Sequence, residues 1–163
     1  MPTRLTLETK QEDIVITRVF DAPRELIFLA WTNPQHLAQW WGPRGFTCPR
    51  CEMDVRPGGL IRIDMRAPNG AIYPMCGVYL EIATPERITY TAGALDEKGF
   101  QLFEFLHVVN FGERDGKTTL VMKTQLVKTT VEAAKYIGGF EAGMSQSLEK
   151  LATQLLEERT VKA

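Results

Sequence analysis

The spacing of hydrophobic residues changes from one region of this chain to the next. A β-branched run over residues 14–20 predicts a strand that ends before Pro23. After Pro23, apolar residues recur three and four positions apart, which predicts a helix. Asn33 and Pro34 form a second helix start, and Gly42-Pro43 ends the short helix that follows. The first 43 residues are therefore expected to form one strand and two short helices.

From Phe46 onward the hydrophobic period falls to two, which is typical of strands with one buried face. Asp115-Gly116 lies between two such stretches and is a strong hairpin signal, because both central residues of that turn need a positive φ. We therefore expect neighbouring strands to pair antiparallel. The predicted strands cover residues 46–55, 60–67, 72–82, 87–93, 101–112 and 118–127.

A long helix is predicted over residues 131–157. Its apolar residues lie three and four positions apart and so define one stripe. A helix of that length rises about 40 Å, and a ten-residue strand spans roughly 33 Å, so the helix can cross the whole sheet. The stripe consists of Ile137, Phe140, Met144, Leu148, Leu151 and Leu155.

Composition narrows the class of protein. The 163 residues carry a formal net charge of -1, so there is no basic field for nucleic acid or an anionic membrane. No apolar run is long enough to span a bilayer, and the polar N-terminus is unlike a signal peptide, so we expect a cytoplasmic location. The length fits a single domain, 1–163, with its core over about 14–157.

The strand over residues 101–112 carries the most informative pattern. Phe103, Phe105, His107, Val109 and Phe111 share one face, which we expect to look toward the C-terminal helix. His107 has two interpretations in that apolar setting: a base or hydrogen-bond partner for a ligand, or a core histidine satisfied by a neighbouring hydroxyl or carbonyl. We favour the core histidine, although His107 is the best single candidate for chemistry.

The same alternation indicates which other side chains face inward. They are mostly apolar, with a few polar atoms, which is the makeup of a small-molecule pocket and also of a fully packed core. No residue is assigned as catalytic; if the protein were an enzyme, His107 and Tyr90 would be its acid/base pair. The candidate ligand-binding residues are Ile61, Ile63, Met65, Tyr90, Phe105, His107, Met122, Thr124, Phe140, Met144 and Ser147.

Two further motifs are weaker. Cys48 and Cys51 have metal-ligand spacing, but no second such pair exists, and the two should fall on opposite faces of one strand. We therefore expect no metal and no other cofactor. The tryptophans could stack on a base or sugar, but their helical spacing favours packing in the core or at a pocket rim. They are Trp31, Trp40 and Trp41.

Several ordered stretches resemble a known family. They are TRVFDAPRELIFLAWTNPQHLAQWWGPRGFT, CEMDVRPGG, GVYLEIATPERITY, DGKTTL and GGFEAGMSQSLEKLATQL. Together they are similar to the bacterial activator of heat shock protein 90 ATPase-like proteins of the START/SRPBCC superfamily, from about residue 14 to residue 156. The resemblance implies an α+β helix-grip (START/Bet v 1-like) fold. In that fold a seven-stranded curved antiparallel sheet has two short helices after its first strand and a long C-terminal helix over its concave face.

Three functions are compatible with these observations. The resemblance implies a cavity, because members of the superfamily typically keep one. This favours binding of a small hydrophobic or amphipathic molecule, without obligatory catalysis. The alternatives are a cyclase-, dehydratase- or hydrolase-like enzyme using the same cavity, and a regulatory module that contacts a chaperone ATPase. We rank the chaperone partner lower, because the name-giving proteins carry an additional domain. Exposed edge strands also allow a homodimer.

Overall fold

The computed structural model describes residues 13–130 and 137–162. Seven antiparallel strands form one sheet in the order β1-β7-β6-β5-β4-β3-β2, so that β1 and β2 are its edges. The predicted strands are confirmed, and no strand end is displaced by more than two residues. The strands are β1 Ile14–Phe20, β2 Thr47–Met53, β3 Leu60–Arg66, β4 Ile72–Ala83, β5 Arg87–Ala94, β6 Phe103–Arg114 and β7 Lys117–Thr129.

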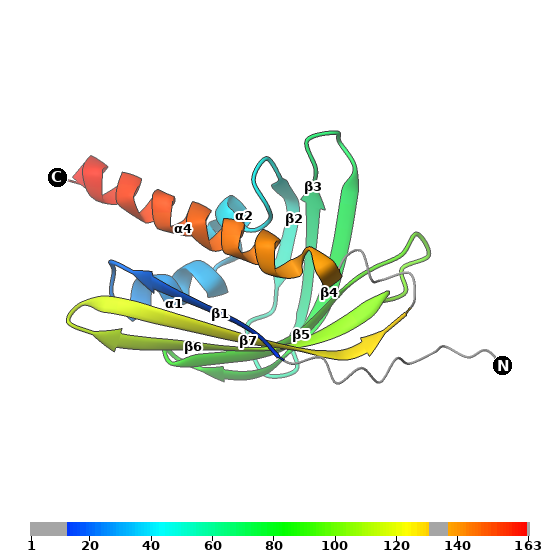
Figure 1. Cartoon of the computed structure of the whole chain (residues 1–163), viewed down its shortest axis with the longest axis horizontal. Helices are drawn as coiled ribbons and strands as arrows, with labels where there is room; N and C mark the ends of the chain where they lie inside the picture. The colour runs from blue at the N-terminus through cyan, green and yellow to red at the C-terminus, as the bar shows by residue number, and fades with distance from the viewer. Residues whose placement is uncertain (1–12, 131–136, 163) are drawn as a thin grey trace.

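Within the described residues the sheet is joined by the helices α1 Arg24–Thr32, α2 Pro34–Trp40 and α4 Phe140–Lys162. The sheet curves around α4, which lies along its concave side, and α1 and α2 close one end of that concavity (Figure 1). Asn33 begins α2 as predicted, because its side-chain oxygen accepts hydrogen bonds from the N–H groups of Gln35 and His36. In the part of the chain that the structure describes, no helix is both long and apolar enough to cross a bilayer.

The predicted C-terminal helix needs two corrections. Residues 137 and 138 are helical, Gly139 is a turn, and α4 then begins at Phe140, so the helix is interrupted where two glycines meet. It also continues to Lys162, beyond the predicted end at residue 157. Its predicted start at residue 131 lies outside the described residues. The apolar stripe is confirmed from Phe140 to Leu155: Met144, Leu148 and Leu151 are buried in the core.

The hairpin between β6 and β7 forms as its sequence predicts. Asp115 and Gly116 have φ values of 55° and 76°, and Arg114 pairs directly with Lys117. This turn fixes the register of β6, whose residues from Phe103 to Phe111 alternate between buried and half-buried. The aromatic face of β6 therefore points into the concavity, and Phe105 reaches Phe140 of α4 with ring centroids 4.9 Å apart.

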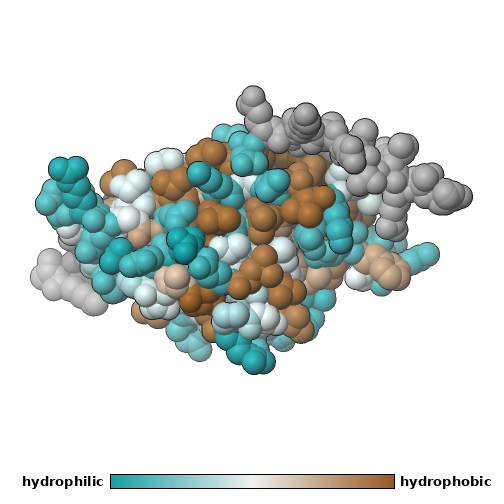
Figure 2. All heavy atoms as spheres, turned by 90° about the horizontal axis from the view of Figure 1, so that it is seen from below, coloured by the Kyte–Doolittle hydropathy of each residue, from teal (hydrophilic) through white to brown (hydrophobic). Residues whose placement is uncertain are grey.

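The outer face of the sheet has a mixed surface. On the side at the bottom of Figure 1, hydrophobic and hydrophilic residues alternate over short distances (Figure 2). Val15, Val19 and Val127 are among the exposed apolar side chains, on β1 and β7. The concave side holds the buried core, so any enclosed site must lie between the sheet and the helices.

Candidate ligand-binding site

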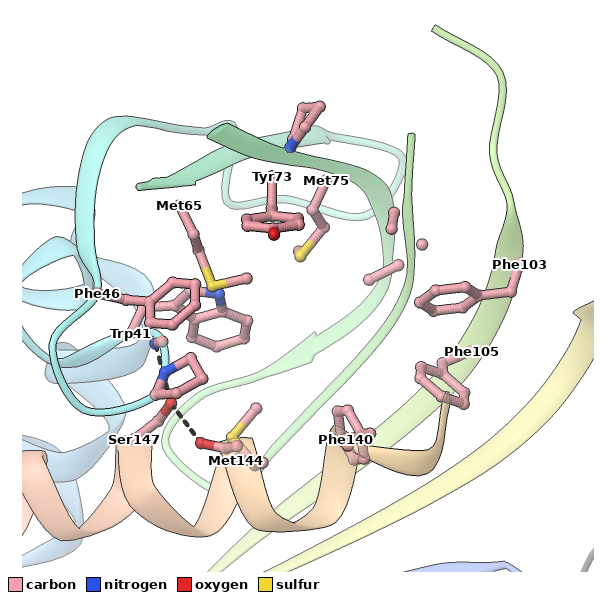
Figure 3. A pocket seen from close by; sticks show the side chains of 18 residues that line it. Trp41, Phe46, Met65, Tyr73, Met75, Phe103, Phe105, Phe140, Met144 and Ser147 are labelled. Atoms are coloured by element: carbon pink, nitrogen blue, oxygen red, sulfur yellow. Dashed lines mark hydrogen bonds between the residues drawn. The ribbon is translucent and has the colours of Figure 1, made fainter. Parts of the chain in front are cut away.

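A cavity of about 290 Å³ lies between α4, the chain that joins α2 to β2, and strands β3 to β6. Below we call it the outer cavity. Side chains from the sheet and from the first turns of α4 point toward this space (Figure 3). Its aromatic lining residues are Trp41, Phe46, Tyr73, Phe103, Phe105 and Phe140.

Methionines and small residues form the rest of the wall. Met65, Met75 and Met144 line the outer cavity, as do glycines and alanines of β5 and α4. None of the described residues that line the outer cavity is charged. The hydroxyl groups in this lining belong to Tyr73 and Ser147. The cavity volume lies at the lower end of the range for small-molecule sites, roughly 300–1,000 Å³. Such a wall favours an apolar occupant.

Strand register places the methionines and Tyr73 on this wall. Met65 of β3 lies opposite Tyr73 of β4, and Ile63 lies opposite Met75. Directly opposed residues of an antiparallel pair share a face, so all four point into the concavity. Gly42, with φ +102°, lets the chain after α2 pass close by, because a Cβ there would lie 3.2 Å from the Met65 sulfur.

Hydrogen bonds from α4 hold the wall formed by residues 42–46. The Ser147 hydroxyl accepts from the Gly42 N–H at 2.9 Å and donates to the Gly143 carbonyl at 3.0 Å. The Lys150 ammonium donates to the carbonyls of Gly42 at 3.2 Å and Phe46 at 3.5 Å. Because both hydrogen-bonding roles of Ser147 are used, its hydroxyl supports the wall.

His107 lies beside the outer cavity but is not among the described residues that line it. It is 3% exposed, and its Nδ1 lies 2.8 Å from Oγ1 of Thr124. Its ring stacks on Phe140, with centroids 5.4 Å apart, and contacts Tyr90 at 4.6 Å. Burial lowers the pKa of His107 to about 3, so the imidazole is uncharged at neutral pH.

A second, much smaller space, the inner cavity, has a volume of about 10 Å³. Two polar atoms of its lining residues, Trp31 Nε1 and the Tyr90 hydroxyl, are buried without a hydrogen-bond partner among the described residues. Leaving such a group unpaired costs roughly 1–3 kcal/mol. Burial holds the pKa of Tyr90 well above its usual value, so this hydroxyl keeps its proton. Two residues that line the inner cavity thus each carry a buried polar group without a partner among the described residues.

The structure divides the eleven residues proposed from the sequence into three groups. Met65, Phe105, Phe140, Met144 and Ser147 line the outer cavity. A second group, Ile61, Ile63 and Tyr90, lines the inner cavity. The remaining residues, His107, Met122 and Thr124, are buried and are not among the described residues that line either cavity.

Sequence reasoning missed several lining residues. Tyr73 and Met75 follow from the register of β3 and β4, and Phe103 lies on the same face as Phe105. Their signal was therefore present in the alternation pattern. Trp41 was expected in the core or at a pocket rim, and it is buried and lines both cavities. Phe46 follows the loop after α2, and nothing in the sequence pattern shows that this loop folds against α4.

The prediction that Cys48 and Cys51 fall on opposite faces is wrong. The pairing of β2 with β3 shifts between Thr47 and Arg50, and this bulge lets both cysteines pack against the core. Burial raises the pKa of Cys48 to about 11 and that of Cys51 to about 12, so both remain thiols. Among the residues that the structure describes, no group of three or more His, Cys, Asp or Glu side chains is arranged to hold a metal ion.

Comparison with known proteins identifies relatives of this chain. The family described as Activator of Hsp90 ATPase homolog 1-like protein matches residues 21–156. No curated protein matches. A solution structure from Arthrobacter aurescens has a TM-score of 0.79 at 21% identity, covering 93% of this chain and 92% of that one.

Two crystal structures are similar at slightly higher identity. A protein from Chromobacterium violaceum is 27% identical, with a TM-score of 0.74, and the match covers 88% of this chain and 97% of that one. A protein named AHSA1 from Silicibacter pomeroyi is 25% identical, with a TM-score of 0.76, covering 90% of this chain and 99% of that one. These matches show the helix-grip fold predicted from the sequence.

Proposed function

The chain belongs to the family of Activator of Hsp90 ATPase homolog 1-like proteins, and from this premise we propose that it binds a small, uncharged hydrophobic or amphipathic molecule. The ligand occupies the outer cavity, between the sheet and α4. Binding requires no chemical step. Family membership indicates a ligand-binding or regulatory role, and the cavity favours the ligand-binding one.

The observation that carries this proposal is the outer cavity itself. A space of about 290 Å³ that is lined by aromatic rings, methionines and small residues remains within the concavity. Apolar surface that a ligand removes from water there contributes about 25 cal/mol per Å². Because no described lining residue is charged, a charged ligand atom in the cavity would lose its hydration without gaining a counter-charge.

The enzyme alternative receives less support from the geometry. His107 and Tyr90 are in ring contact, but neither is among the described residues that line the outer cavity. The His107 ring nitrogen Nδ1 is already engaged with Thr124. A general base must lie within hydrogen-bond reach of the proton that it removes, and a substrate in the outer cavity would not meet that condition at His107.

A thermal-shift screen tests the proposal directly. Purified protein is heated with a library of apolar aromatics, polyketides and single-chain lipids, and native mass spectrometry then checks each hit for a one-to-one complex. A ligand at 100 times its dissociation constant stabilises the folded state by about 2.7 kcal/mol. The absence of any shift across uncharged apolar compounds would contradict ligand binding.

A cavity-filling variant assigns each hit to the outer cavity. Ala92→Leu places a larger side chain on the cavity wall and should abolish the ligand-induced shift while the protein stays folded. The matched control, Ala142→Leu, makes the same change at an exposed position of α4 and should bind as the wild type does. If the ligand-induced shift changes equally in Ala92→Leu and Ala142→Leu, the ligand binds elsewhere.

A regulatory role toward a chaperone is tested separately. The ATPase rate of a purified heat shock protein 90 is measured with and without this chain, using wild type and Ala92→Leu. Stimulation that is unaffected by Ala92→Leu would place the function on the protein surface rather than in the cavity.

A further inference from the structure

The inner cavity lies next to the outer one. On two of the same strands, the residue that lines the inner cavity is two positions away from a residue that lines the outer cavity. On β5, Ala92 lines the outer cavity and Tyr90 lines the inner one. On β3, Met65 lines the outer cavity and Ile63 the inner one. Side chains two residues apart on a strand share a face and lie about 7 Å from each other. The two spaces are therefore separated by roughly one strand period.

Two side chains form the boundary, because Trp41 and Met75 line both cavities. Trp41 is buried and packs on Trp31 and Trp40, with ring centroids 6.0 Å and 5.6 Å away. Met75 is half-buried, and its thioether points into the outer cavity (Figure 3). An unbranched methionine changes rotamer easily. Met75 is thus the part of the boundary that can move aside.

The residues that line the inner cavity restrict which group of a ligand can bind there. An indole N–H only donates, so a partner for Trp31 must accept a hydrogen bond. Tyr90 keeps its proton, and its hydroxyl, buried without a partner among the described residues, belongs to a second lining residue of the same cavity that can donate. No charged side chain is among the described residues that line the inner cavity, so an anionic acceptor would lack a counter-charge. A space of about 10 Å³ holds one atom of the size of an oxygen.

We propose that the ligand is an uncharged apolar molecule with a terminal carbonyl oxygen, a ketone or an aldehyde, which passes Met75 and accepts hydrogen bonds from Tyr90 and Trp31. The apolar body of the ligand stays in the outer cavity. This inference rests on the proposed function, because it adds a polar anchor to the same binding site. No bond is made or broken.

A pair of shape-matched probes tests the anchor. 2-Acetylnaphthalene carries the carbonyl, and 2-isopropenylnaphthalene replaces its oxygen with a methylene group. Calorimetric titration should show that wild type binds the ketone about tenfold more tightly, the gain expected from one to two buried hydrogen bonds. 2-Naphthoate, which carries a charge, should bind more weakly than both.

Variants of two neighbouring β5 residues assign the effect. Tyr90→Phe removes the unpaired hydroxyl and should bring the affinities for ketone and alkene within about twofold. Thr91→Val is the matched control, because it removes a hydroxyl from the opposite face of β5, at a residue that is not among the described lining residues of either cavity. Thr91→Val should keep the preference for the ketone.

The indole N–H resonances provide a readout that needs no variant. Adding the ketone to ¹⁵N-labelled wild type should shift the Trp31 indole proton downfield, and adding the alkene should not. Trp40 is the internal control, because its Nε1–H already donates to the Ala30 carbonyl at 3.1 Å. Its resonance should move equally little with either probe.

The outcomes separate the two proposals. If both probes bind with equal affinity and the Trp31 resonance does not distinguish them, the inner cavity holds water only, and the carbonyl anchor is refuted while the proposed function stands. If the ketone preference survives Tyr90→Phe, the anchor is also refuted. If neither probe binds, the outer cavity does not accept such apolar molecules, and both proposals fall.

Discussion

The two ends of the concavity are both rich in aromatic residues, yet one is solid and the other is hollow. The packed end consists of Phe28, Trp31, Trp40 and Phe111, all of which are at most 6% exposed. The hollow end consists of Phe46, Tyr73, Phe103, Phe105 and Phe140, which surround the outer cavity. Aromatic content therefore does not decide where this protein keeps a cavity.

The packed and hollow ends differ because different helices cover them. At the packed end α1 and α2 contribute large side chains that meet edge to face, as Trp31 and Phe111 do with centroids 6.1 Å apart. The cover at the hollow end is the start of α4, where Gly139 and Gly143 line the space, opposite Ala92 of β5. Small residues on facing surfaces leave a volume that the surrounding rings cannot fill.

The largest effect is expected from Trp40→Ala. The Trp40 side chain is fully buried, contacts Trp31 and Trp41, and donates a hydrogen bond to Ala30. Its truncation should lower the free energy of unfolding by about 3–5 kcal/mol. Urea denaturation followed by far-UV circular dichroism measures the change.

The counterpart at the hollow end is Phe140→Ala. Phe140 is only partly buried and borders the outer cavity, so less apolar surface returns to water and the loss should be about 1–2 kcal/mol. Equal losses for Trp40→Ala and Phe140→Ala would show that both ends are packed alike, and the comparison would be wrong.

His107, at the edge of the hollow end, adds an effect that depends on pH. Its pKa is lowered to about 3 in the folded protein, against about 6.5 for an unfolded histidine. Between these values the unfolded chain binds more protons, so stability falls as the pH falls from about 6.5 to 3. One such group contributes ~1.4 kcal/mol per pH unit.

The variant His107→Phe isolates this contribution. It keeps an aromatic ring but cannot be protonated, so its stability between pH 6 and pH 4 should fall less steeply than that of wild type. Urea titrations at three or four pH values measure both slopes. Identical slopes would show that His107 has the same pKa in the folded and unfolded protein, with more water around its ring than a packed wall allows.

The fold could be predicted from the sequence because its determinants are local. Alternation from Phe103 to Phe111 identifies the buried face of β6, and Asp115-Gly116 fixes the β6–β7 register. The interruption at Gly139 was missed, because the predicted helix ran through that residue without a break. The bulge that turns Cys48 and Cys51 inward also left no periodic signal, since one extra residue shifts the alternation.

The site was harder to predict because a cavity depends on side chains from separate elements. Alternation showed that Met65, Phe105 and His107 all face inward, and all three are found there. It could not show that Met65 and Phe105 border space whereas His107 is enclosed by Tyr90, Thr124 and Phe140. That distinction depends on how far α4 stands from each strand, and no single segment encodes it.

Ser147→Ala tests how firmly the wall of the hollow end is held. The substitution leaves the buried Gly42 N–H without its acceptor, which should cost about 1–3 kcal/mol in the free energy of unfolding. Ser145→Ala is the matched control on the exposed side of α4 and should change stability by less than about 0.5 kcal/mol. A neutral Ser147→Ala would mean that residues 42–46 do not depend on α4.

The smallest effect is expected where the packed end meets the inner cavity. Because the Tyr90 hydroxyl is buried without a partner among the described residues, Tyr90→Phe removes a group that makes no favourable contact and keeps the ring on His107. The free energy of unfolding without ligand should therefore stay within about 0.5 kcal/mol of wild type or rise slightly. A loss of about 1 kcal/mol or more would show that the hydroxyl is hydrogen-bonded in the free protein. The inner cavity would then belong to the packed end, as a solid part of the core, and the boundary between the two ends would lie at Met75.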